Sequence, residues 1–173
     1  MSDQQSSHLQ RMTIQLEVVP EDEQAADIAD IDEVGRSLVD QLRSSKYTVT
    51  PVYTGKKGGE PVFDILMQVP QFLHNNKDLL LEIFDSISLV LQCVLIARDR
   101  RTEREKAQRD PLKITFEADG KPVTIETSDA DSGAKLLEKL RTAHPEAVKK
   151  ITPQSSAKIK ASVPPKRKRQ RPH

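Results

Sequence analysis

The sequence predicts an α+β fold, in which a small sheet of about four strands includes a C-terminal hairpin and a long apolar helix packs across the sheet. Three observations indicate this class. Several short segments alternate apolar and polar residues, which is typical of half-buried strands. Residues 79–97 form the longest apolar run in an otherwise polar chain. Asp119-Gly120 joins two alternating segments, and Asp-Gly is a strong hairpin signal because glycine accepts the positive φ of the turn.

Composition indicates one domain with tails, because the 173 residues are only 36% hydrophobic and 31% are charged. We expect residues 1–11 to be disordered, residues 12–150 to fold as one α+β domain, and residues 151–173 to form a disordered basic tail. The single cysteine, Cys93, excludes an internal disulfide and fits a reducing compartment. The first residues lack the apolar segment of a signal peptide, so we expect a cytoplasmic protein.

The N-terminal part of the predicted domain carries strand, helix and strand patterns in that order. Residues 13–19 alternate and predict a half-buried strand. The following helix has acidic residues clustered at its N-terminal end, where the helix dipole favours them. Residues 47–53 predict a second strand, and Pro51, which lacks a backbone donor, places it at a sheet edge or a bend. The apolar stripe of the predicted helix consists of Ile28, Ile31, Val34, Leu38 and Leu42.

The central part of the chain predicts a loop and two helices. Residues 54–61 are expected to form a flexible loop, and residues 62–73 a helix with a break before Pro70. Residues 79–97 predict a long helix that is apolar nearly all round. Such a helix is buried in a core, pairs with another chain or lies in a membrane. The same helical phase continues through residues 98–108, which would project past the core as a charged extension.

We favour burial of the long helix, with some surface left for a partner chain. A membrane span is disfavoured because the longest uncharged run in it has 12 residues, whereas a bilayer requires about 20. A single-span or membrane-surface protein remains the alternative that detergent dependence would identify. The candidate partner interface on this helix consists of Leu89, Leu91, Val94 and Leu95.

The C-terminal part of the predicted domain contains the hairpin and one more helix. Residues 112–118 and 122–127 both alternate and form the two strands of the hairpin. Ser128 with Asp131 resembles a capping arrangement that opens a helix, and this helix ends near His144-Pro145. Its inner face consists of Leu136, Leu137 and Leu140. From Ile151 onward proline, serine and lysine dominate, and we expect removal of this tail to leave the fold unchanged.

Residues 12–150, about four fifths of the chain, resemble the effector-associated constant component family of bacterial conflict systems. The matching features are the strand TIQLEVVPED, a helix ending in VDQLRSS, the segment TGKKGGEPVFDIL, the helix LLLEIFDSISLVLQCVLIARDRR, the hairpin KITFEADGKPVTIE and the helix AKLLEKL. The chain departs from the family in its lower glycine and alanine content and its basic tail. The resemblance implies a small non-catalytic component, encoded beside effectors such as peptidases and beside signalling ATPases. It supplies no catalytic residues.

The candidate chemical groups do not combine into a recognisable site. The glycines and lysines of residues 55–59 could cradle a phosphate, but the Walker A spacing is absent, which favours a solvated loop. Cys93 lies within the apolar helix, where we expect a buried and unactivated thiol. No two histidines have the spacing of metal ligands on one helix. We therefore expect a protein that is not an enzyme and has no cofactor and no metal.

The tail provides the strongest chemical signal. Residues 151–173 contain seven of the 27 basic residues and no acid, which leaves 20 bases and 26 acids, a formal charge of −6, in the rest of the chain. We expect an effector or a regulatory ATPase as the partner, with a homo-oligomer also open. The alternative function is binding of a polyanion, such as nucleic acid or an anionic surface. The candidate polyanion-binding residues are Lys158, Lys160, Lys166, Arg167, Lys168, Arg169 and Arg171.

Overall fold

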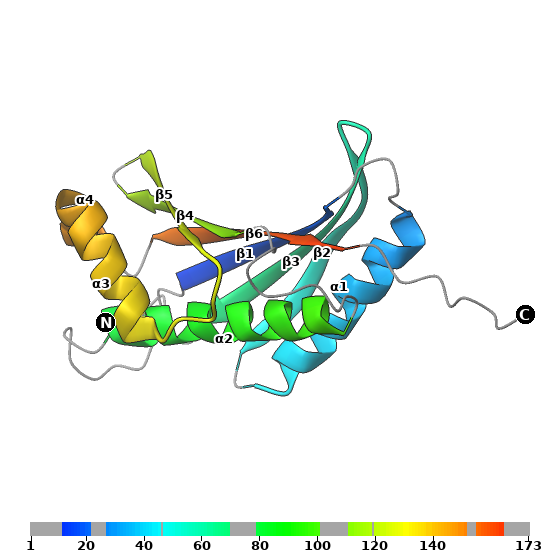
Figure 1. The fold of residues 1–173 in the computed structure, drawn as a ribbon, viewed down its shortest axis with the longest axis horizontal. Helices are drawn as coiled ribbons and strands as arrows, with labels where there is room; N and C mark the ends of the chain where they lie inside the picture. The colour runs from blue at the N-terminus through cyan, green and yellow to red at the C-terminus, as the bar shows by residue number, and fades with distance from the viewer. Residues whose placement is uncertain are drawn as a thin grey trace, which may run out of the picture.

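The computed structural model describes residues 12–21, 27–45, 47–69, 79–100, 111–118, 120–151 and 155–164. These residues form an α+β fold around a mixed six-stranded sheet with the order β2-β3-β1-β6-β4-β5. Helices α1 and α2 lie against the same face of the sheet (Figure 1). The predicted α+β class and the long apolar helix are confirmed, but the prediction of about four strands is wrong.

The described part of the chain contains ten elements. Their bounds are β1 Met12–Pro20, α1 Ile28–Arg43, β2 Thr48–Lys57, β3 Glu60–Val69, α2 Leu79–Asp99, β4 Leu112–Ala118, β5 Lys121–Thr127, α3 Gly133–Ala143, α4 Pro145–Lys150 and β6 Ser156–Val163. Strand β1 lies in the middle of the sheet, antiparallel to β3 and parallel to β6. Strands β2 and β5 are the outer strands of the described sheet.

Strand β1 and helix α1 form where the sequence predicts them. The Asp27 carboxylate caps α1 by accepting a hydrogen bond from the Ala29 backbone N–H at 3.0 Å. Four of the five predicted stripe residues are buried, whereas Ile28, at the first turn, is 39% exposed. The predicted edge position of Pro51 is also confirmed, because β2 is an outer strand and its register shifts between Pro51 and Tyr53.

The predicted loop at residues 54–61 and the predicted helix at residues 62–73 are wrong. Strand β2 continues to Lys57, and β3 begins at Glu60, so these residues form an antiparallel hairpin. The turn uses Gly58 and Gly59, whose φ angles of 59° and 85° are both positive, as a tight hairpin connection requires. A short apolar run such as that of β3 does not distinguish strand from helix by periodicity. Residues 70–73 lie outside the described residues.

Helix α2 ends at Asp99, so the predicted charged extension from residue 98 is wrong at its start. The Arg98 side chain is 1% exposed. It donates hydrogen bonds to the Ser162 carbonyl oxygen at 2.7 Å and to the Ser162 hydroxyl at 3.1 Å. The pairing between β4 and β6 ends at Lys160. The Arg98 guanidinium therefore donates to β6 two residues beyond the last pair with β4. Residues 101–108 lie outside the described residues.

The predicted hairpin is confirmed as β4 and β5, with Gly120 at a φ of 72° in the turn. The predicted cap of α3 is wrong, because the N-cap is Ser132, whose hydroxyl accepts from the Lys135 backbone N–H. Asp131 instead accepts from the Thr127 hydroxyl at 3.1 Å and pairs with the Lys139 ammonium. The three predicted leucines of α3 are buried as expected, and the short helix α4 follows.

The prediction of a disordered tail is wrong for residues 156–163, which form the central strand β6. Ala157, Ile159, Ala161 and Val163 point into the core and alternate with more exposed residues. Strand β6 pairs parallel with β1 and antiparallel with β4, so it joins the two halves of the sheet. The folded unit therefore extends beyond the predicted boundary at residue 150. Residues 1–11 and 165–173 lie outside the described residues.

Candidate functional site

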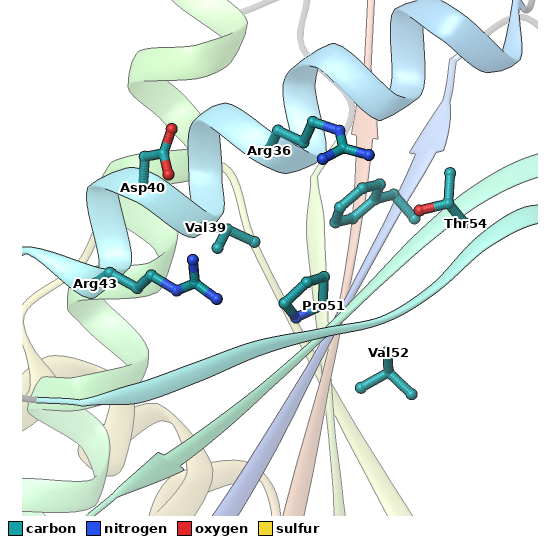
Figure 2. Close-up of a pocket in the computed structure, with 8 residues that line it drawn as sticks. Arg36, Val39, Asp40, Arg43, Pro51, Val52 and Thr54 are labelled. Atoms are coloured by element: carbon teal, nitrogen blue, oxygen red, sulfur yellow. The ribbon is translucent and has the colours of Figure 1, made fainter.

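A groove lies between helix α1 and the outer strand β2, with a hollow of about 370 Å³ (Figure 2). Its lining residues are Arg36, Val39, Asp40, Arg43, Pro51, Val52, Thr54 and Phe63. We call this hollow the α1–β2 groove. The residues from α1 are spaced by three or four positions and therefore lie on one side of the helix.

The base of the groove depends on close approach of α1 to the sheet. Phe63 of β3 is 1% exposed and lies beneath the helix. Gly35 lies directly against it, because a Cβ atom added to this glycine would be 2.2 Å from Phe63 Cγ. The absence of a side chain at position 35 therefore sets the depth at which α1 packs on the sheet.

The β2 side of the groove contains a β-bulge. The register passes from the Pro51–Ile65 pair to the Tyr53–Asp64 pair, which leaves Val52 without a partner on β3. Val52 is 61% exposed, an unusual environment for a large apolar side chain in a strand. Bulges redirect side chains and are enriched beside functional sites. The bulge thus exposes Val52 on the side of β2 that faces away from α1, whereas Pro51 lies on the α1 side (Figure 2).

Two arginines determine the charge of the groove. The Arg36 Nε atom donates to Asp32 Oδ2 at 2.7 Å, and this hydrogen bond raises the pKa of Arg36. The Arg43 Nε atom donates to the Val49 carbonyl oxygen at 3.2 Å. In Figure 2 the Arg43 guanidinium extends from α1 toward β2, the Arg36 side chain runs alongside α1, and the Asp40 carboxylate points away from the strand. Each arginine therefore uses its Nε atom within the protein, and both side chains line the groove.

The partner interface predicted on α2 is only partly available. Leu91 and Val94 are fully buried in the core and cannot contact a partner in the folded protein. Leu89 and Leu95 are partly buried and pack against the same core. The large apolar side chains that α2 exposes are instead Leu81 and Ile96, at 40% and 46%. The sequence did not identify these two residues, because α2 is apolar nearly all round and its pattern does not show which side of the helix is exposed.

The predicted polyanion-binding residues are divided by the structure. Lys158 and Lys160 are exposed residues of β6, on the sheet face opposite its buried side chains. Lys158 forms an ion pair with Glu17 at 3.0 Å, and Lys160 lies between Glu17 of β1 and Lys113 of β4 in the register. The five basic residues from Lys166 to Arg171 lie outside the described residues. The described lysines thus belong to a mixed-charge surface.

An acidic pair that sequence reasoning missed lies on this same surface. Glu17 and Asp64 are directly opposite each other on β1 and β3, at 9% and 3% exposure. Asp64 Oδ2 is 2.5 Å from the Lys57 ammonium, while Asp64 Oδ1 has no hydrogen-bond partner. Like charges in direct cross-strand pairs are destabilising, so the neighbouring lysines are needed to offset them. The available signal was Glu17, a charged residue inside the predicted strand at residues 13–19, whereas Asp64 lay in a segment that was predicted to be a helix.

Other candidate features have less defined chemistry. A second hollow of about 640 Å³ lies between β5 and α3. Residues 55–57, considered as part of a phosphate loop, belong to β2 instead.

Burial raises the pKa of the Cys93 thiol. Within the described ranges, no group of three or more histidine, cysteine, aspartate or glutamate side chains could hold a metal ion. Leu80–Asp99 is long and apolar enough to cross a membrane, yet half of the tested window is buried within the fold.

No family model, curated protein or solved structure matches this chain. The α1–β2 groove combines a concave shape with charged side chains and the exposed ring of Pro51.

Proposed function

We propose that the chain is a non-catalytic interaction module of a bacterial conflict system, which recruits or regulates a protein effector in the cytoplasm. The observation that carries the proposal is the α1–β2 groove. A hollow between a helix and an outer strand, lined by arginine and apolar side chains, suits a segment of another protein. The resemblance of residues 12–150 to effector-associated components adds the class of partner, an effector or a regulatory ATPase of the same system.

The chemistry of the described residues agrees with a role in binding. A nucleophilic cysteine requires an accessible and electropositive setting, which lowers its pKa. Burial has the opposite effect on Cys93. The buried carboxylates of Glu17 and Asp64 are each beside a lysine, as in structural ion pairs. The proposed role requires no cofactor and no metal.

Co-purification tests this function. The tagged full-length protein would be co-expressed with the products of its neighbouring genes, and the bound proteins would be identified by mass spectrometry. We expect an effector or an ATPase to co-elute in a fixed ratio that survives gel filtration. Elution of the chain without any of these proteins, with the tag at either end, would contradict the proposal.

A second candidate function is polyanion binding through the basic C-terminal residues. The supporting observation is the register that places Lys113 beside Lys160, with Lys158 two residues earlier on β6. Glu17 and Glu126 lie within 4 Å of Lys158 and Lys113 respectively, which reduces the net charge. Heparin retention tests it. Replacing the five basic residues from Lys166 to Arg171 should abolish retention if they carry the function, whereas Lys158→Ala with Lys160→Ala should reduce it only slightly.

A further inference from the structure

We propose that the α1–β2 groove binds an extended segment of a partner protein that carries two carboxylate side chains, one for Arg36 and one for Arg43. This inference rests on the proposed interaction role and names the chemical class of the partner. It is drawn from the spacing of the two arginines, from the groups they leave available and from the apolar side chains between them.

The spacing of the arginines matches an extended chain. Arg36 and Arg43 are seven residues apart on α1, so their backbone positions are about 10 Å apart at a rise of about 1.5 Å per residue. An extended segment advances about 3.3 Å per residue, so carboxylates two or three residues apart are about 7–10 Å apart. Two flexible arginine side chains can therefore each reach one carboxylate of the same segment.

The guanidinium groups remain available for such a ligand. Arginine has five N–H donors, in a planar fork that fits a carboxylate with two hydrogen bonds. Arg36 shares only its Nε atom with Asp32, and the Arg36 side chain in this pair is 73% exposed. Such an exposed pair contributes little stability and exchanges readily for another carboxylate. Arg43 is held beside β2 by its hydrogen bond to Val49, which orients it before a ligand binds.

The β2 side of the groove favours a ligand that is recognised through its side chains and not through strand pairing with β2. Pro51 lies on the α1 side of β2 and provides an apolar surface between the two arginines, suited to an apolar residue placed between two acids (Figure 2). Pro51 lacks a backbone donor, and the bulge at Val52 interrupts the regular ladder of β2. Both features oppose the addition of a full strand at this edge. Specificity for the segment would therefore come from its carboxylates and from the apolar residue between them.

The hollow between β5 and α3 provides the contrast. Its charged lining residues are two lysines, Lys135 and Lys139, and two glutamates, Glu126 and Glu138, whereas the α1–β2 groove is lined by two arginines and one aspartate. Lys139 also pairs with Asp131. This hollow has no arginine and therefore lacks the planar donor that binds a carboxylate with two hydrogen bonds.

The test uses the full-length protein and a short fluorescein-labelled peptide of alternating aspartate and valine. We expect saturable binding by fluorescence anisotropy at low salt, which the combined substitutions Arg36→Glu and Arg43→Glu weaken by about tenfold or more. Arg36→Glu and Arg43→Glu are also made singly, and Arg141→Glu, an exposed arginine on α3 that does not line the groove, is the matched control for each single substitution and should change the affinity less than about twofold. A peptide with asparagine in place of aspartate should bind far more weakly.

Several outcomes would overturn the assignment. Equal losses with Arg141→Glu and with either groove substitution made singly would indicate non-specific charge attraction. Stronger binding of a single-stranded DNA oligonucleotide with the same arginine dependence would assign the groove to a polyanion. If circular dichroism shows that the substituted protein is unfolded, amide chemical-shift mapping of the unaltered protein decides. Peptide-induced shifts should lie on α1 and β2, and shifts confined to β5 and α3 would refute the proposal.

Co-purification with the substituted protein and peptide binding together separate a failure of the groove assignment from a failure of the proposed function. If the effector co-purifies equally well after Arg36→Glu and Arg43→Glu, the interaction role stands and the groove is not its site. If the acidic peptide binds through both arginines but no neighbouring gene product co-purifies, the groove assignment stands and the conflict-system role fails.

Discussion

The face of the sheet that α1 and α2 cover is built from aliphatic and aromatic side chains, whereas the opposite face carries ion pairs. On the covered face, the rings of Phe84 and Phe116 have centroids 5.2 Å apart within a continuous apolar core. On the opposite face, Glu17 and Asp64 lie side by side and each contacts a lysine. Apolar burial scales with area, while ion pairs mostly offset their own desolvation. The covered face should therefore determine folding, and the opposite face should change stability only modestly.

The largest effect should come from removing β6, which has its apolar residues on the covered face and its lysines on the other. A chain ending at Lys150 would separate β1 from β4 and expose both edges. We expect this protein to lack a cooperative thermal transition. A chain ending at Pro165 should retain the transition of the full-length protein. A folded protein ending at Lys150 would show that β6 is dispensable for the core.

Strand β6 also shows what the sequence could not establish. Residues 157, 159, 161 and 163 do alternate with polar residues, but two of the four are alanines and the intervening lysines continue into a basic segment. The low hydrophobicity of this window suggested a tail. The reason it folds is non-local, because β6 pairs with a strand about 140 residues earlier in the chain.

Elements with a strong local signal were predicted correctly. These are β1, α1, α2, the β4–β5 hairpin and the body of α3. The α1–β2 groove was not predicted, because it depends on a bulge at Val52 and on the contact between Gly35 and Phe63. Both features arise from the packing of a helix on a hairpin that the sequence pattern did not reveal. Arg36 and Arg43 were therefore ordinary surface residues until the fold placed them together.

The next largest effect should come from a charge on the covered face. Leu91 is fully buried, so Leu91→Asp places an unpaired carboxylate in the core and should cost about 3–5 kcal/mol or more, enough to unfold the domain. Gln92→Asp, one position further on the exposed side of α2, is the matched control and should change stability by about 0.5 kcal/mol or less. Urea denaturation measures both. Similar midpoints for the two proteins would show that α2 is not buried as described.

A smaller effect is expected on the opposite face. Lys57→Ala leaves the buried Asp64 carboxylate without its ion-pair partner and should cost about 1–3 kcal/mol. The Lys57 side chain is 48% exposed, so solvent screening keeps the cost below that of a fully buried pair. Combining Lys57→Ala with Asp64→Asn should recover part of the loss, because no unpaired carboxylate is then left at position 64. Additive losses in the double-mutant cycle would show that the two groups are not coupled.

The smallest effect should come from the ion pair between Asp131 and Lys139 before α3. The Lys139 hydrogen bond is the main cause that lowers the pKa of Asp131 in the folded protein. The folded state therefore favours the carboxylate form of Asp131 more than the unfolded chain does, in which the pKa of an aspartate is about 3.9. This contribution to stability is complete above that pKa and is lost as the pH falls through the lower pKa of the folded state.

Because Lys139 is half exposed, Asp131→Asn should cost at most about 1 kcal/mol at pH 7. Urea melts of both proteins should show a difference at pH 7 that shrinks toward zero as the medium becomes more acidic than the folded pKa. A difference that stays constant with pH would mean that Asp131 acts through its shape and its bond to Thr127, without any contribution from its charge.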